Sequence, residues 1–157
     1  MARSGKRETS LVSPLGATPF DSAVHATCIA MQDRGLLVLG AAGSGKSALA
    51  LQLIALGAKL VADDRVLLSD EDGGITATAP EPIAGLIEAR GLGVLNAPVC
   101  KRAPIRLVVS MDHVETERIP PFRTCQIGPY TVPLVHKSDN GHFPAAVALY
   151  LLHGRKE

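Results

Sequence analysis

A glycine-rich stretch of eight residues constrains this chain more than any other feature of its sequence. It matches the pattern G-x-x-x-x-G-K-[ST], follows an apolar run typical of a strand, and opens a run of helix-forming residues. Its glycines permit backbone conformations closed to other residues, so that successive N–H groups can surround a phosphate at the start of a helix. The sequence therefore predicts a phosphate-binding loop made of Gly40, Ala41, Ala42, Gly43, Ser44, Gly45, Lys46 and Ser47.

Two side chains of this loop carry specific chemistry. In loops of this pattern the lysine, here Lys46, reaches the β- and γ-phosphates of a nucleoside triphosphate, and the hydroxyl residue, here Ser47, ligates Mg²⁺. A glycine-rich turn that merely begins a helix is the weaker interpretation in this context. Because such loops occur in kinases, GTPases, ATPases and motors alike, the reaction has to be inferred from other residues.

The composition excludes several other functions. A length of 157 residues with 46% hydrophobic residues fits one globular domain. The net charge of +1 argues against binding to duplex nucleic acid, and the absence of Trp argues against stacking on single strands. Three cysteines at unrelated spacings indicate neither a disulfide framework nor a zinc site. With no apolar run long enough to span a bilayer and no secretory signal, we expect a cytoplasmic protein without nucleic-acid or membrane partners.

The pattern along the chain predicts an α/β fold. Residues 1–20 lack any hydrophobic period and are expected to form a flexible leader, whereas residues 21–157 are expected to form one domain. A hairpin of two strands, the glycine-rich loop, a buried helix and a further strand make up a βαβ unit, followed by short strands and a final helix. The expected strands are 23–31, 35–40, 59–62, 65–68, 75–79, 105–111 and 130–135, and the expected helices are 46–56 and 144–153.

An acidic pair follows the strand after the predicted helix. Asp63 and Asp64 come at the carboxyl end of that strand, where open α/β sheets carry their ligand chemistry. One carboxylate there can accept a proton from an attacking hydroxyl while its neighbour orients it or binds a metal. The alternative is a simple turn before the surface residue Arg65.

Glu88 and Arg90 form a second candidate pair. They lie two residues apart, hence on one side of an extended segment, before a glycine-rich turn. Glu88 is a candidate Mg²⁺ ligand and Arg90 a candidate partner for a phosphate, whereas a solvated ion pair is the equally open alternative. His25 and Arg118 considered singly are ordinary: a core histidine in an apolar strand and a surface charge.

Taken together, four segments resemble the catalytic domain of the HPr kinase/phosphorylase family. They are His25, the glycine-rich loop, LVADDRV at 60–66 and IEARGLGVLN at 87–96, which resembles the family signature L-E-I-R-G-L-G. The resemblance runs from about Val24 to Leu152 and implies a P-loop-containing, phosphoenolpyruvate-carboxykinase-like mixed sheet with flanking helices, usually assembled as a homohexamer. It implies an ATP-dependent serine kinase acting on the phosphocarrier protein HPr, in the regulation of the phosphotransferase system and carbon metabolism. Many members also remove the phosphate with inorganic phosphate, yielding pyrophosphate.

The resemblance implies a role for each matching residue. Asp64 corresponds to the general base of phosphorylation and the general acid of the reverse reaction, with Asp63 as its partner, and Lys46 and Ser47 correspond to the loop lysine and the metal-binding serine. Glu88 matches the second Mg²⁺ ligand, Arg118 in E-R-I-P an active-site arginine, and His25 the strand histidine that helps hold the carboxylate or the incoming phosphate.

The sequence also departs from the family pattern. Only about twenty residues precede the core, which resembles the short form without the usual N-terminal domain, and the stretch 134–140 lacks the glycine-arginine pattern tied to dephosphorylation. Kinase activity is therefore the firmer part of the expectation and phosphorylase activity the weaker. Two alternatives stay open from the residues: a P-loop kinase of a small metabolite, and a nucleotide-sensing module without catalysis.

Overall fold

The structure is a computed structural model that describes residues 9–11 and 23–157. Most of the predicted leader, residues 1–8 and 12–20, lies outside the described residues, as do residues 21 and 22. Within it, Thr9–Leu11 forms the short strand β1, which pairs in parallel with β11, Arg123–Ile127. No helix in the described part of the chain combines the length and the apolar character needed to cross a membrane.

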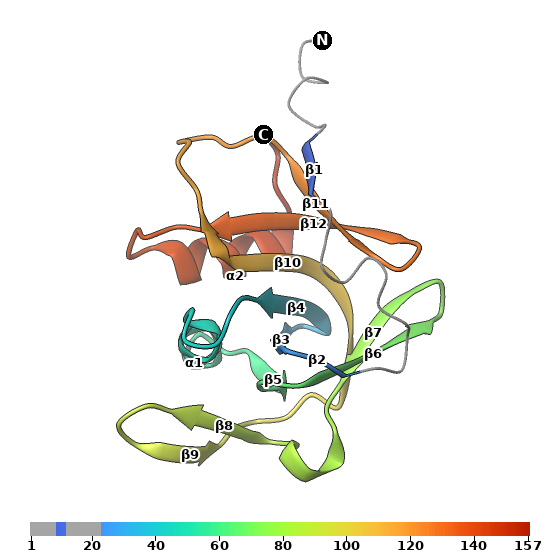
Figure 1. The fold of residues 1–157 in the computed structure, drawn as a ribbon, viewed down its shortest axis with the longest axis vertical. Helices are drawn as coiled ribbons and strands as arrows, with labels where there is room; N and C mark the ends of the chain where they lie inside the picture. Colours follow the sequence, from blue (N-terminus) through green and yellow to red (C-terminus); the bar gives the residue numbers. More distant parts are fainter. Residues whose placement is uncertain (1–8, 12–22) are drawn as a thin grey trace.

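The fold is a curled mixed sheet with two helices, α1 and α2 (Figure 1). The main sheet has the order β1-β11-β12-β10-β4-β3-β5, and β2, β6 and β7 extend it through the long strand β10. The remaining strands are β2 (Ala23–Val24), β3 (Ala26–Met31), β4 (Arg34–Leu39), β5 (Lys59–Ala62), β6 (Val66–Glu71), β7 (Gly74–Thr78), β8 (Leu86–Ala89), β9 (Gly93–Asn96), β10 (Arg102–Val114) and β12 (Tyr130–Lys137). The helices are α1 (Lys46–Ala55) and α2 (Phe143–His153), with a short 3₁₀ turn η2 (Glu81–Ile83).

The predicted βαβ unit is present, with one strand inserted in it. β3 pairs antiparallel with both β4 and β5, so β4 and β5 run parallel on either side of β3 and α1 connects them. α1 ends at Ala55, one residue before the predicted end, and Gly57 just beyond it adopts a left-handed conformation (φ 110°) while its N–H donates to the carbonyl of Ile54. The sequence prediction of an α/β fold is therefore confirmed.

Strand alternation divides the core into two layers. In β4, Leu36 and Val38 face the helices and pack with Leu49 and Leu53 of α1, whereas Leu37 faces the opposite layer. All of these side chains are buried. Because β10 runs parallel to β4 beside it, the carboxyl ends of both strands meet at the edge of the sheet where the glycine-rich loop begins.

Several predicted boundaries were wrong. The strand expected at 105–111 extends over Arg102–Val114, because its first residues pair with β7 before it turns to β4 at a register shift near Ile105. β11 was not predicted, the final helix begins at Phe143, and the segment 86–96 forms a hairpin rather than one extended stretch. Arg90 lies in the turn of that hairpin, so it does not share a strand face with Glu88.

A charged cluster lies beside the end of β10, at the edge of the sheet where the glycine-rich loop begins. Arg123 of β11 donates to both carboxylate oxygens of Glu115 at 3.1 Å, and both side chains are largely buried. His136 of β12 lies beside them, 10% exposed, with Nδ1 3.9 Å from Oε1 of Glu115, and its ring stacks on that of His113 at 5.0 Å. Burial, followed by the nearby positive charge of Arg123, lowers the pKa of His136.

This lowered pKa predicts loss of stability in acid. Because the unfolded chain binds a proton at His136 near its ordinary pKa of about 6.5 while the folded chain binds it only at a lower pH, the free energy of unfolding falls as the pH drops through that range. Urea unfolding of the wild type at pH 7.5 and 5.5 measures this dependence. We expect a smaller drop for His136→Gln, and an unchanged drop for the control His153→Gln at an exposed position. Equal drops in the wild type and His136→Gln would contradict the assignment.

Candidate active site

The predicted phosphate loop connects the end of β4 to the start of α1. Gly40, Gly43 and Gly45 all have positive φ, as the pattern requires. At Gly40 a side chain has no room, since an added Cβ would stand 2.4 Å from Oγ of Ser44. Gly45 caps the helix at φ 104°, so that the N-terminus of α1 points into the loop, where helix amides favour an anion.

Lys46 lies across this loop. Its ammonium donates to the carbonyl oxygens of Gly40 at 2.8 Å and of Ala41 at 3.1 Å, and only 6% of the residue is exposed. The positive charge is therefore fixed at the loop by two backbone acceptors. A bound phosphate would meet this charge in a low-dielectric setting, where its attraction is stronger than in water.

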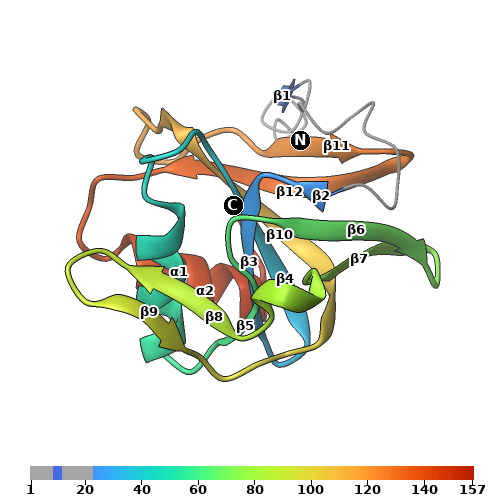
Figure 2. The same ribbon diagram turned by 60° about the horizontal axis from the view of Figure 1, so that its bottom comes forward.

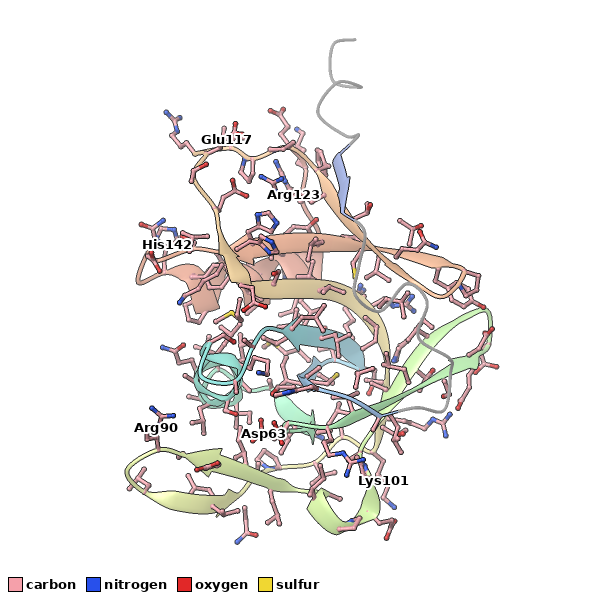
Figure 3. All side chains as sticks on the ribbon, in the orientation of Figure 1. Asp63, Arg90, Lys101, Glu117, Arg123 and His142 are labelled. Carbon is pink, nitrogen blue, oxygen red and sulfur yellow. The ribbon has the colours of Figure 1, made fainter. Side chains whose placement is uncertain are left out.

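Asp63 joins three elements below the loop. Its Oδ1 accepts hydrogen bonds from the hydroxyl of Ser47 at 2.7 Å and the hydroxyl of Thr27 at 2.9 Å, and its Oδ2 accepts the N–H of Glu88 at 3.3 Å. It is 7% exposed, so it is not the surface turn residue of the alternative interpretation. Figure 3 shows Asp63 between α1 and the β8–β9 hairpin. This carboxylate links β3, α1 and β8 at the floor of the site.

Asp64 has the opposite setting. Its side chain is 73% exposed, and its Oδ1 lies 3.1 Å from Nε2 of His25. Its backbone is left-handed, with φ 71°, which Asp tolerates better than most residues. His25 itself is 53% exposed at the bend between β2 and β3, so the expectation of a histidine inside an apolar strand was wrong.

A pocket of about 630 Å³ opens above these residues. It brings together most of the predicted site, and residues of the β8–β9 hairpin form one wall. Figure 2 shows this hairpin beside α1. Four of the other predicted site residues are not on the pocket lining: Asp63, Gly40, Ala41 and Ser44. The lining residues that the sequence predicted are His25, Ala42, Gly43, Gly45, Lys46, Ser47, Asp64, Glu88 and Arg90.

Arg118 lies outside this pocket. It is exposed, in the connection between β10 and β11, and its neighbour Glu117 stands at the opposite end of the molecule from Arg90 in Figure 3. Arg155 holds this connection by donating to the carbonyl oxygen of Pro120 and by lying over the ring of Phe122, 4.1 Å from its centroid. The structure therefore does not bring Arg118 to the other predicted residues.

Two further residues at the site were not predicted. Oδ1 of Asp112, at the end of β10, accepts the N–H of Ala41 at 3.0 Å and so braces the loop from the neighbouring strand. Thr27, fully buried in β3, contacts both aspartates. The position of Asp112 after an apolar run marks the end of a strand, but which strand lies beside the loop strand is set by tertiary pairing, so the sequence holds only part of the signal.

The oxygen atoms present suit a hard cation such as Mg²⁺. The Ser47 hydroxyl donates its proton in a hydrogen bond to Asp63, so the lone pairs of the Ser47 oxygen are free to bind a cation. The side chain of Glu88 is exposed on the pocket wall. Mg²⁺ in phosphate sites takes one or two protein oxygens together with phosphate and water. Ser47 and Glu88 therefore fit such an ion.

The glycine-rich loop at the N-terminus of α1, with the ammonium of Lys46 across it, defines a P-loop protein, the class whose loop binds the phosphates of a nucleotide. The profile of the HPr Serine kinase C-terminal domain matches residues 19–120, which is more than half of the sequence, so the chain belongs to that family. This confirms the family resemblance and the fold it implied.

Individual HPr kinases are similar to this chain in sequence and in structure. The chain is 32% identical over 105 residues to an HPr kinase/phosphorylase of Clostridium novyi (strain NT), covering 62% of this chain and 34% of the relative. It is 45% identical over 76 residues to one of Geobacillus sp. (strain WCH70), covering 48% of this chain and 24% of the relative. The Hpr(Ser) kinase/phosphatase of Coxiella burnetii has a similar structure, with a TM-score of 0.68, 26% identity and coverage of 80% of this chain and 86% of that one. The chain thus spans about a third or less of the length of the two HPr kinase/phosphorylase relatives.

Proposed function

We propose that this chain is an ATP-dependent serine kinase that phosphorylates HPr. The observation that carries the proposal is Asp64, an exposed carboxylate in contact with His25 in the pocket that Lys46 and Ser47 also line. Membership of the HPr Serine kinase family and the names of the relatives support HPr as the acceptor. A cytoplasmic location and a homo-oligomer, in the family a homohexamer, belong to the same proposal.

The reaction assigns a task to each residue. The acceptor serine oxygen attacks the γ-phosphorus, the bond from that phosphorus to the bridging oxygen of ADP breaks, and the hydroxyl proton passes to Asp64. His25 holds the Asp64 carboxylate in place, and Lys46 offsets negative charge on the phosphates. When bound, Mg²⁺ neutralises charge on the phosphate oxygens, and Ser47 and Glu88 would hold it.

The remaining residues have supporting roles. Arg90, exposed in the hairpin turn, borders the pocket and is proposed to contact a phosphate. Asp63 positions Ser47 rather than contacting substrate, because its oxygens already accept three hydrogen bonds. Arg118 stays in the proposal as an active-site arginine on the strength of the family motif alone.

The test is transfer of labelled phosphate. The purified full chain is incubated with HPr, Mg²⁺ and γ-labelled ATP, and the labelled residue on HPr is identified by mass spectrometry. We expect label on a serine of HPr. If ATP binds but no label reaches HPr, the acceptor is wrong, and a small-metabolite kinase or a nucleotide sensor takes its place.

The reverse reaction is tested with the phosphorylated HPr from this experiment. Phosphorylated HPr is separated from ATP and incubated with inorganic phosphate, which as the attacking group would yield pyrophosphate and free HPr. Asp64 would then take the proton of the attacking phosphate and donate it to the serine oxygen as the bond from that oxygen to phosphorus breaks. Release of pyrophosphate adds phosphorylase activity to the proposal, whereas stable phospho-HPr restricts the chain to the kinase direction.

A further inference from the structure

Thr27 stands directly beneath the two aspartates, outside the pocket. It belongs to β3, is fully buried, and is absent from the pocket lining. Its hydroxyl donates to Oδ1 of Asp63 at 2.9 Å and accepts the N–H of Asp64 in a longer contact of 3.5 Å. A single hydroxyl therefore touches both members of the acidic pair, 36 and 37 residues away in the chain.

The contact with Asp63 gives its carboxylate oxygen Oδ1 a second hydrogen-bond donor. Thr27 and Ser47 donate to the same oxygen, Oδ1, while Oδ2 accepts the N–H of Glu88. Because a carboxylate is planar, fixing both oxygens from different sides sets the rotation of the whole group. Loss of the Thr27 hydroxyl leaves Oδ1 with one side-chain donor, Ser47, which also has to present its lone pairs to the pocket, and leaves Oδ2 with the N–H of Glu88.

The contact with Asp64 acts on the backbone. The carbonyl oxygen of Asp64 accepts the N–H of Ala26 at 3.3 Å, and the Asp64 N–H points to the Thr27 hydroxyl. Both polar backbone groups of Asp64 are thus held by the two residues that follow His25. This arrangement keeps Asp64 in its left-handed conformation and its carboxylate next to His25.

We propose that Thr27 is a positioning residue for phosphoryl transfer, whose hydroxyl sets the carboxylate of Asp63 and the backbone of Asp64. This rests on the proposed kinase function. Thr27 contacts no substrate, so its removal alters the geometry of the reacting groups rather than the binding of ATP. A displacement of about 1 Å in a catalytic group can cost on the order of 10²-fold in rate.

The comparison uses three variants. Thr27→Val keeps the shape of the side chain and removes the hydroxyl, Thr27→Ser keeps the hydroxyl, and Thr76→Val removes a hydroxyl from a similarly buried threonine in β7. We expect kcat for transfer to HPr to fall by about 10- to 100-fold in Thr27→Val, with KM for ATP within about threefold of the wild type. Thr27→Ser and Thr76→Val should stay within about threefold of the wild type in both constants.

Crystal structures of the wild type and Thr27→Val give a readout that does not depend on activity. We expect the Asp63 carboxylate to rotate and the contact between His25 and Asp64 to be lost in the variant. If Thr27→Val does not fold, Thr27→Cys replaces it, because a thiol is a weak donor of similar size.

The outcomes separate the two proposals. If the wild type transfers no phosphate to HPr, the kinase proposal fails, and the crystal structures still decide whether Thr27 sets the aspartates. If the wild type is active and Thr27→Val retains its kcat, or loses no more than Thr76→Val, the positioning role is overturned. Unmoved carboxylates in Thr27→Val overturn it as well.

Discussion

Asp64→Asn is expected to reduce phosphoryl transfer to HPr by about 10²- to 10⁴-fold, the usual contribution of a general base. Asparagine has the same shape as aspartate and also tolerates the left-handed backbone found at this position (φ 71°), so the fold should be kept. What is lost is the acceptor for the serine proton, next to His25. Steady-state transfer of labelled phosphate measures the effect, and calorimetry should find ATP binding within about threefold of the wild type, since the role proposed for Asp64 is to accept the hydroxyl proton and not to bind the nucleotide.

The chain offers a matched control for this substitution. Asp72, in the turn between β6 and β7, is exposed, has a left-handed backbone with φ 52°, and is not on the pocket lining. Asp72→Asn makes the same chemical change in the same backbone conformation and should leave the rate unchanged. If Asp64→Asn transfers phosphate as fast as Asp72→Asn, Asp64 is not the base, and the acidic pair has to be given another role.

The local features of the site were predictable because each rests on neighbouring residues. The positive φ of Gly40 and Gly45, the start of α1 at Lys46 and its end before Gly57 all depend on residues within one or two turns of chain. The hairpin of β3 and β4 followed from a polar turn between two apolar runs. Such signals need no knowledge of the rest of the fold.

The contacts that organise the aspartates were not predictable in this way. Thr27 lies 36 residues from Asp63, and Asp112 lies 71 residues from Ala41. Their meeting depends on β3 pairing with β5 and on β10 running parallel to β4, which no local pattern specifies. The different settings of Asp63 and Asp64, one buried and one exposed, also come from tertiary packing, because the two residues are adjacent in sequence.

Arg118 shows where a motif and a structure give different information. The E-R-I-P sequence indicates an active-site arginine by resemblance, yet Arg118 is not on the pocket lining, and Arg155 contacts the connection that carries it at Pro120 and Phe122. Residue type and spacing do not report the path of a long connection between strands, here residues 115–122.

Lys46→Met is expected to weaken ATP binding and transfer together. Methionine has a similar length and fills the buried space of the lysine side chain, but it cannot donate to the carbonyl oxygens of Gly40 and Ala41 and carries no charge. Removing one preorganised donor of this kind costs on the order of 10²- to 10³-fold in rate. Single-turnover transfer to HPr and calorimetric titration with Mg²⁺ and ATP measure the two effects.

Two comparisons are needed to interpret a loss of transfer in Lys46→Met: the control Lys101→Met and the variant Asp64→Asn. Lys101→Met removes a charge at an exposed position away from the pocket and should match the wild type. Because the proposal places Lys46 against phosphate in both the ground state and the transition state, its loss should lower both binding and rate, whereas Asp64→Asn should lower the rate alone. Transfer by Lys46→Met within threefold of Lys101→Met would mean that the loop holds its ligand through backbone amides and the helix N-terminus, and that the lysine serves only to stabilise the loop.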